Sequence, residues 1–411
     1  MLFIVSSYLF LACDTVDDLE KLNNQVFLKL YGGIGSEEGK DFIQLPDGGF
    51  VIVGYTSSYT EDDRDIFVVR TDQNGNEIWS NRYGDNLINI GNSVILTDNN
   101  TLIVCGETIQ VNGRRDILIK EIDLDGNELN SLTHGEIDSD EYGTDIIKAI
   151  SDGYLILGNS VFGNPINPDS AYFYLLEVDE NLIVKPNRDR PFIGDKNNFN
   201  QGMAVSIYQG QEYLCFGTTK EGGVNAPPGS NNFYIFKIGE IGDATNTQNF
   251  FGTNLNEIGT SLAKISGGYL LTGYQINGNR HIPYLVKVND DLALNPVWQN
   301  TFDVPYNSSV ISRTPTSVIE TMDGNIVILM NSDIQPFGSE IGLMKINSSG
   351  QDVIWENSFG SNNNDKTGGI IELRDGQFVM CGSIGFGEEN NEEINKMGLF
   401  KTNPFGELIP L

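Results

Sequence analysis

The stretch Leu45-Pro46-Asp47-Gly48-Gly49-Phe50-Val51-Ile52-Val53-Gly54 decides the fold, because it is the clearest copy of a pattern that recurs along the whole chain. Its Asp-Gly-Gly is typical of a tight hairpin turn, since glycine adopts positive φ at little cost. The apolar run Phe50–Val53 then indicates a strand buried on both faces, which ends at Gly54.

The residues on either side of this stretch complete one structural unit. A third strand is predicted at Asp65–Asp72, a turn at Asp72–Gly75 and a fourth strand around Trp79, and Tyr83-Gly84 closes the unit. Four short strands joined by tight turns within roughly 50 residues predict one four-stranded antiparallel sheet.

The same order of elements recurs seven times. The last position of the second strand in each unit is Gly54, Gly106, Gly158, Gly217, Gly273, Met330 and Gly382. The repeated units span about residues 31–82, 83–133, 134–190, 191–249, 250–301, 302–358 and 359–411. All three tryptophans, Trp79, Trp298 and Trp355, fall near the start of a fourth strand, where we expect them to anchor one unit on the next.

These repeats predict an all-β fold, a seven-bladed β-propeller of four-stranded antiparallel blades, over residues 25–411. The propeller resolves the size of the chain, because 411 residues exceed the ~250–300 that one hydrophobic core supports. The segment Gln25–Gly32 matches a fourth strand that has no preceding blade. We therefore expect this N-terminal strand to complete the last blade and close the ring.

The N-terminal segment predicts export. Leu2–Ala12 is apolar but shorter than the ~20 residues that span a bilayer, so residues 1–12 are interpreted as a signal peptide. Ala12 directly before Cys13, with Asp14 after it, resembles a bacterial lipobox. That resemblance implies a lipid on Cys13, a tether over residues 13–24, and a periplasmic or surface-exposed protein attached to the outer membrane. The alternatives are an ordinary cleaved signal and a frayed N-terminus in which Cys13 is incidental.

The repeat itself resembles the "DGG-hydrophobic-G" propeller repeats of bacterial exported lipoproteins. The resemblance covers about residues 25–411 and includes the Asp-hydrophobic, Trp and Tyr-Gly elements quoted above. It implies the propeller fold and a location outside the cytoplasm, and it implies no reaction.

The charge of the chain excludes two classes of partner. With 56 acidic and 25 basic residues, the formal net charge is −31. Nucleic acids require basic patches, and so does direct adhesion to anionic lipid. We therefore expect no nucleic acid, membrane contact only through the anchor, and a monomeric domain. Glycans, basic proteins and divalent cations remain compatible with this charge.

Few residues suggest catalysis or metal binding. Cys105, Cys215 and Cys381 are interpreted as small buried hydrophobes without a disulfide. His134 is expected to pack, and His281 to precede a third strand without an evident partner. No catalytic residue, metal site or cofactor is assigned, since the Asp-x-Asn-Gly turns lack the downstream Glu of a calcium loop, although loop carboxylates could accept calcium.

Long loops are predicted to gather on one face of the ring, where they connect strand four to strand one and strand two to strand three. This face is expected to be acidic and rich in Asn. The candidate ligand-face residues on it are Tyr59, Asp62, Asp63, Asp138, Asp140, Phe162, Phe337 and Phe386. Carboxylates and exposed aromatic rings fit a sugar, so the leading hypothesis is a non-enzymatic envelope lipoprotein that binds a glycan or a protein partner. The alternatives are a carboxylate-dependent glycan hydrolase or lyase, and a structural assembly factor of the envelope.

Overall fold

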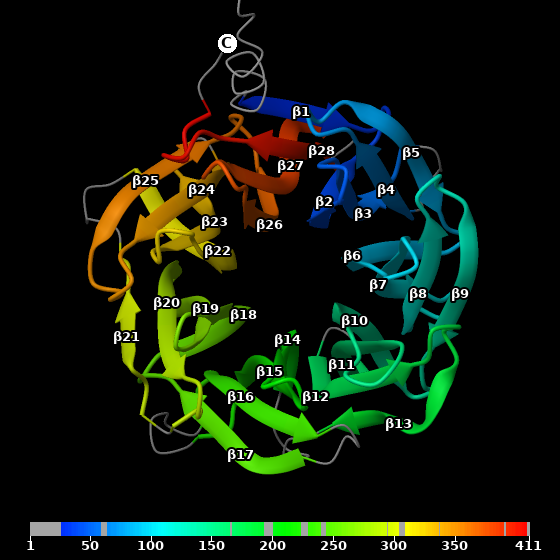
Figure 1. The fold of residues 1–411 in the computed structure, drawn as a ribbon, viewed down its shortest axis with the longest axis horizontal. Helices are drawn as coiled ribbons and strands as arrows, with labels where there is room; N and C mark the ends of the chain where they lie inside the picture. Colours follow the sequence, from blue (N-terminus) through cyan, green and yellow to red (C-terminus); the bar gives the residue numbers. More distant parts are fainter. Residues whose placement is uncertain are drawn as a thin grey trace, which may run out of the picture.

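The computed structural model describes residues 26–58, 64–164, 167–192, 200–222, 229–239, 244–293, 295–303, 309–336, 338–389 and 392–408. These residues form 28 β-strands and no helix. The strands make seven four-stranded antiparallel sheets, which stand as blades around a central axis (Figure 1). The predicted seven-bladed β-propeller is therefore confirmed.

Blades 1 to 4 each contain four strands that are consecutive in the chain. Blade 1 contains β2 (Glu37–Gln44), β3 (Phe50–Thr56), β4 (Asp65–Thr71) and β5 (Glu77–Tyr83). Blade 2 contains β6 (Ile88–Leu96), β7 (Thr101–Ile109), β8 (Arg115–Asp123) and β9 (Glu128–His134). Blade 3 contains β10 (Ser139–Lys148), β11 (Tyr154–Asn164), β12 (Asn167–Val178) and β13 (Val184–Phe192). Blade 4 contains β14 (Asn200–Tyr208), β15 (Glu212–Thr219), β16 (Asn232–Gly239) and β17 (Ala244–Phe251).

Blades 5 and 6 repeat this order, and blade 7 borrows its outer strand. Blade 5 contains β18 (Asn256–Ile265), β19 (Gly268–Asn277), β20 (Arg280–Asn289) and β21 (Trp298–Thr301). Blade 6 contains β22 (Val310–Glu320), β23 (Ile326–Ile334), β24 (Gly338–Ile346) and β25 (Val353–Phe359). Blade 7 contains β26 (Lys366–Glu372), β27 (Phe378–Glu389), β28 (Glu392–Lys401) and the N-terminal β1 (Phe27–Tyr31).

The N-terminal strand closes the ring, as the sequence predicts. β1 pairs antiparallel with β28, from Phe27 opposite Lys401 to Tyr31 opposite Met397. In Figure 1 the blue β1 accordingly lies beside the red β28. One sheet thus joins the two ends of the described chain, and β1 covers the outer edge of β28.

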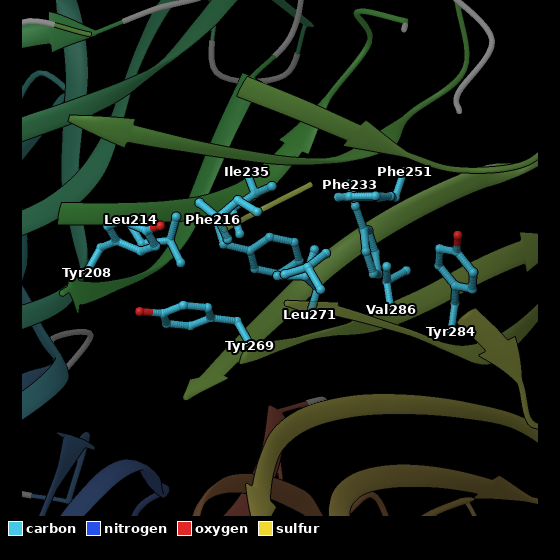
Figure 2. Close-up of a cluster of buried hydrophobic side chains, with 12 residues drawn as sticks. Tyr208, Leu214, Phe216, Phe233, Ile235, Phe251, Tyr269, Leu271, Tyr284 and Val286 are labelled. Atoms are coloured by element: carbon cyan, nitrogen blue, oxygen red, sulfur yellow. The ribbon is translucent and has the colours of Figure 1, made fainter. Parts of the chain in front are cut away.

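The hydrophobic core is divided among the gaps between blades. Each of seven clusters of buried side chains draws its members from two neighbouring blades. Between blades 4 and 5 this layer is aromatic (Figure 2). There Phe233 packs edge-on against Phe216 within blade 4, with centroids 5.2 Å apart, and reaches Tyr284 of blade 5 at 5.0 Å. Such ring pairs add stability beyond the burial of apolar area.

The recurring glycine at the end of the second strand has a steric cause. In blade 4, Gly217 lies opposite Gly202 on the inner strand, where the register of the pair shifts. A Cβ at Gly217 would overlap the carbonyl oxygen of Gln201 and lie 2.9 Å from the Phe173 ring of blade 3. The same close approach to an inner-strand carbonyl recurs at Gly54, Gly106, Gly158, Gly273 and Gly382.

The outer strands hold each blade to the next one. Trp79 donates its indole N–H to the carbonyl oxygen of Leu124 in blade 2, at 2.9 Å. Trp298 and Trp355 pack over Gly350 and Gly406, in the turns of the following blades. The predicted anchoring role of the tryptophans is confirmed. Asparagine side chains on the outer strands add donors to backbone carbonyls of the next blade at Asn81, Asn130, Asn249, Asn300 and Asn357.

The three described cysteines are free and buried, as predicted. Cys105 belongs to the layer between blades 2 and 3, and Cys215 to the layer between blades 3 and 4. Cys381 lies between blades 7 and 1. All three act as small apolar side chains of the core.

Candidate functional site

The two faces of the ring differ in the loops that they carry. Loops from strand four to strand one, and from strand two to strand three, emerge on one face, which we call the loop face. The other face carries tight turns such as Leu45–Gly49, closed by the backbone hydrogen bond from Leu45 N–H to Gly49 O at 2.8 Å. Binding surfaces are common on long loops held by a rigid scaffold, so the loop face is the candidate site.

Several carboxylates of the loop face are structural. Glu37 and Glu141 are fully buried, and each accepts a backbone N–H from the loop that precedes its strand. Asp365 accepts the N–H of Ser361 at 2.6 Å in the same way. Burial raises the pKa of Asp365, whereas its backbone and side-chain hydrogen bonds with Ser361 and Gly385 lower it. These acids fix the loops, so they add little acidic surface.

The structure places four of the predicted ligand-face residues, and they do not form one site. Asp138, Asp140 and Phe162 lie in or beside blade 3, whereas Phe386 lies in blade 7. Asp138 and Phe386 are exposed, while Asp140 is buried in an ion pair with Arg114 at 3.3 Å. Phe162 is half-buried and packs edge-on against Tyr172. Five further predicted residues lie outside the described residues: Cys13, Tyr59, Asp62, Asp63 and Phe337.

A polar groove opens on the loop face between blades 6 and 7. Its volume is about 420 Å³, and we call it the blade 6–7 groove. One side is formed by Pro336 and Gly338, and the other by the loop Asn362–Asn364 that leads into blade 7. Its remaining lining residues come from β27 and β28: Gly385, Gly387, Glu393 and Asn395. Phe386 lies between two of the lining glycines in sequence, but its side chain is not part of the lining.

The walls of this groove are held by a hydrogen-bond network. Asn363 donates to the carbonyl oxygen of Gly385 at 3.2 Å. Asn364 donates to Glu393 Oε1 at 2.5 Å and accepts the N–H of Ser339 at 3.4 Å. A Cβ at Gly385 would lie 2.9 Å from both Asn363 Cβ and the carbonyl oxygen of Asn364, so glycine lets the loop lie directly on the strand. The groove is therefore a built feature of the fold.

Asn395 supplies an unused acceptor in the groove. The residue is buried, with 2 % of its surface exposed, and its backbone N–H donates to Ser36 Oγ at 3.1 Å. Its Oδ1 has no hydrogen-bond partner among the described residues. A buried acceptor without a partner costs free energy, on the order of 1–3 kcal/mol. Its Oδ1 exposes less than 1 Å², so a ligand donor removes that cost only when the side chain turns toward the groove.

A second depression of about 440 Å³ adjoins the first, and we call it the neighbouring groove. It shares Pro336, Gly338 and Asn364 with the blade 6–7 groove. Its other lining residues belong to blade 6, namely Ile311, Asp333, Ile334, Gln335 and Ser339. The two grooves therefore lie on either side of Pro336 and Gly338 and meet at Asn364.

The sequence holds a partial signal for these grooves. The loop face was predicted to be acidic and rich in Asn, and Glu393 on this face agrees with that prediction. The three consecutive asparagines Asn362–Asn364 mark the loop that forms one wall. Which loops meet depends on the pairing of blades in space, so the residues of the two grooves were not predicted as one site.

The two histidines are both in the described part of the chain, and neither is isolated. His134 Nε2 forms a hydrogen bond with Tyr174 OH at 2.7 Å, which agrees with its predicted packing role. The prediction that His281 precedes a third strand without a partner was wrong. His281 lies within β20, stacks on Tyr274 with centroids 4.3 Å apart, and bonds Thr314 Oγ1 through Nδ1 at 2.8 Å. Burial lowers its pKa.

A second group of acids lies half-buried on the inner strands of the ring. Asp41 of blade 1 accepts from Ser93 Oγ at 2.9 Å and from Val94 N–H at 3.0 Å, both in blade 2. Asp145 of blade 3 accepts the Val205 N–H of blade 4 at 2.8 Å, and Ser93 also lies 3.4 Å from Asp145 Oδ1. These carboxyls tie consecutive inner strands together.

Burial and, less strongly, the nearby Asp41 raise the pKa of Asp145 to about 7, against the hydrogen bond from Val205. An unfolded aspartate ionises near pH 3.9, so between about pH 4 and 7 the folded state binds more protons than the unfolded state. Stability should therefore fall as the pH rises through this window, by up to about 4 kcal/mol from this group. We expect Asp145→Asn to remove most of that slope in thermal unfolding between pH 5 and 8. Equal slopes for the two proteins would contradict this assignment.

Neither a metal cluster nor a membrane-spanning helix is found in the described part of the chain. No three His, Cys, Asp or Glu residues within it are placed to hold a metal ion together. No helix in this part of the chain is long and apolar enough to cross a bilayer.

Comparisons with known proteins show the fold alone. No family model matches the chain, and no curated protein matches it. A PL25 polysaccharide lyase, an ulvan lyase bound to -[GlcA(1-4)Rha3S]-, is similar in structure with a TM-score of 0.55, 12% identity and coverage of 91% of this chain and 95% of that one. Sqt1 from Chaetomium thermophilum has a TM-score of 0.48 at 9% identity and covers 88% and 84%. Drosophila Plexin A in complex with Semaphorin 1b has a TM-score of 0.46 at 7% identity and covers 92% and 87%.

Proposed function

We propose that this chain is a non-enzymatic binding propeller of the bacterial cell envelope, and that its loop face binds a carbohydrate. The observation that carries the proposal is the blade 6–7 groove, where Asn395 offers a buried, unpartnered acceptor. Sugar hydroxyls are donors that suit such an acceptor, and asparagine amides both donate and accept. A protein partner on the same face is the competing outcome.

The residues of the groove favour binding over catalysis. Hydrolysis of a glycosidic bond ordinarily uses two carboxyl groups on opposite sides of one bond. Glu393 is the one carboxylate among the described residues that line the blade 6–7 groove, and it is engaged by Asn364. The other acid close by, Asp333, lines the neighbouring groove, so the described lining of the blade 6–7 groove holds no pair of carboxylates. The similar fold of a polysaccharide lyase supports the capacity of this architecture to hold a glycan, and it brings no catalytic residue to this chain.

A glycan array with the propeller from Val26 onward tests the carbohydrate proposal. We expect Asn395→Leu to abolish array binding, because leucine offers no acceptor, while the free energy of unfolding changes by no more than about 1 kcal/mol. Asn99→Ala is the matched control, since Asn99 is exposed in a turn of the opposite face. No binding to any glycan, together with capture of a defined envelope protein, would replace the proposal with the protein partner.

We also propose that a lipid on Cys13 attaches the chain to the outer membrane, on the periplasmic or the surface side. The apolar segment before Cys13 supports this. β1 starts at Phe27 beside Lys401, at the end of blade 7 where the tight turn Asn403–Gly406 lies. A tether over residues 13–24 would then join the ring at the tight-turn face, and its 12 residues reach at most about 40 Å. The loop face accordingly points away from the membrane.

Replacing the cysteine tests the anchor directly. We expect Cys13→Ser to move the protein from the membrane fraction to the soluble fraction, because the thiol is the site of lipid attachment. Cys105→Ser is the control, since Cys105 is buried in the core and cannot carry a lipid in the folded protein. Retention of Cys13→Ser in the membrane fraction would disprove the anchor and leave the ring and its groove unaffected.

A further inference from the structure

The two grooves adjoin each other at Asn364, and we call them together the path. They share Pro336, Gly338 and Asn364, and their volumes are about 420 and 440 Å³. At one end lies Asn395 with its unpartnered Oδ1, and at the other lies Ile311, which is 39 % exposed. A path of this kind fits an elongated ligand with several units better than a single small molecule.

The charge of this path is acidic or neutral throughout. Its lining includes two carboxylates, Asp333 and Glu393, and neither Lys nor Arg occurs among the described residues that line it. The cations close to these residues are each paired with an acid. Arg280 donates to the carbonyl oxygen of Ile311 at 3.2 Å and pairs with Asp303. Lys366 pairs with Glu38, and Lys396 pairs with Glu37. Sulfate and carboxylate groups of a ligand are ordinarily bound by Arg or Lys, and the net charge of −31 would repel them.

The remaining chemistry of the path suits hydroxyl and C–H groups. Asn395 Oδ1 accepts, the exposed amide of Asn362 donates and accepts, and Asn364 lies where the two grooves meet. Ile311, Ile334 and Pro336 add apolar contact in the neighbouring groove. We infer that the two grooves together bind an uncharged oligosaccharide of several sugar units, and that they discriminate against anionic glycans. This inference rests on the proposed function and names the ligand class of that same site.

Calorimetry with matched neutral and anionic sugars tests the inference. The probes are malto-, cello- and manno-oligosaccharides of two to six units, each also in carboxymethylated and sulfated form. We expect neutral forms of at least one series to bind at least about tenfold more tightly than their anionic forms, because the path holds two carboxylates and no cation. The double variant Asp333→Asn, Glu393→Gln should reduce the ratio of neutral to anionic affinity by about tenfold or more, since it removes both carboxylates.

Length dependence tests whether the two grooves act as one site. We expect affinity to rise by about tenfold or more from two to four units. Ile311→Asp should remove this rise in affinity without weakening the binding of the two-unit sugar. Asn395→Leu should weaken the binding of sugars of every length.

Two negative results separate the inference from the proposed function. Tight binding of anionic forms alone, or affinity independent of length, would overturn the inference and leave a carbohydrate-binding propeller. Absence of binding to every form would overturn both.

Discussion

Gly217→Ala is expected to lower the free energy of unfolding by about 3 kcal/mol or more, although it adds one methyl group. The new Cβ would overlap the carbonyl oxygen of Gln201 on the inner strand and press on the Phe173 ring of blade 3. Neither neighbour is the free end of a flexible side chain, since one is backbone and the other is fully buried. The inner strand has to move, and with it the Gly202–Gly217 pair of blade 4. Chemical denaturation followed by tryptophan fluorescence measures the change.

Gly239→Ala is the matched control for this prediction. Gly239 belongs to the same blade, on β16, and a Cβ there meets no atom within 4 Å. Alanine at such a position restricts the unfolded chain, so the variant should be as stable as the parent or more stable by about 0.4–1 kcal/mol. A similar loss of unfolding free energy in the two variants would show that the close approach of Gly217 to the inner strand is not what requires glycine.

Blade 6 shows how this position is otherwise filled. Its equivalent residue is Met330, which is fully buried and lies opposite Pro315. Each of the other six blades has glycine at the position, and in five of these, blade 7 excepted, glycine also lies opposite it on the inner strand. Blade 6 therefore differs from the other blades on both strands, with Met330 on the second strand and Pro315 opposite it on the inner strand. Its inner strand leaves room for the Met330 side chain. A single Gly→Ala substitution in another blade does not change the inner strand and so creates no such room.

The strands, their order and the closure of the ring were all predictable from the chain, because each depends on local patterns that repeat. Each blade needs tight turns, buried strands and an anchor on its outer strand. The sequence shows these as Asp-Gly pairs, apolar runs such as Phe50–Val53, and tryptophans at the same position of the repeat. Seven weak local signals at one spacing determine the architecture, since a blade must bury both faces against others like itself.

The candidate site was harder to predict, because its residues come from loops of two different blades. Asn395 gives no sequence signal of its own, since its importance lies in an acceptor that burial leaves unpaired. Burial also changed the expected role of one acid. Asp140 was predicted as a surface ligand and is buried against Arg114. Composition counts carboxylates, and only packing decides which of them face the solvent.

A chain that starts at Gly33 is expected to lose ring closure, because it lacks β1. The loss removes Phe27 and Tyr31 from the layer between blades 7 and 1, and also the hydrogen bond from Tyr31 OH to Gly75 O at 2.7 Å. Burial of an aromatic side chain such as Tyr31 contributes roughly 3–5 kcal/mol, and the partly buried Phe27 adds less, so the thermal midpoint should fall sharply. The edge of β28 from Met397 to Lys401 would be open to pairing with another chain.

Two measurements separate lost closure from general damage. A chain that starts at Val26 retains every described strand, so it should elute as a monomer with an unchanged thermal midpoint, whereas the chain from Gly33 should form oligomers. A synthetic peptide of residues 26–32 added to the shorter chain should restore both properties, because β-strand addition needs only a matching edge. The same peptide with Tyr31 replaced by serine should restore them poorly, since it cannot fill the layer between blades 7 and 1. If the chain from Gly33 is monomeric and melts at the same temperature without any peptide, the ring is closed by the contacts of β2 with β26, β27 and β28 alone, and β1 is dispensable.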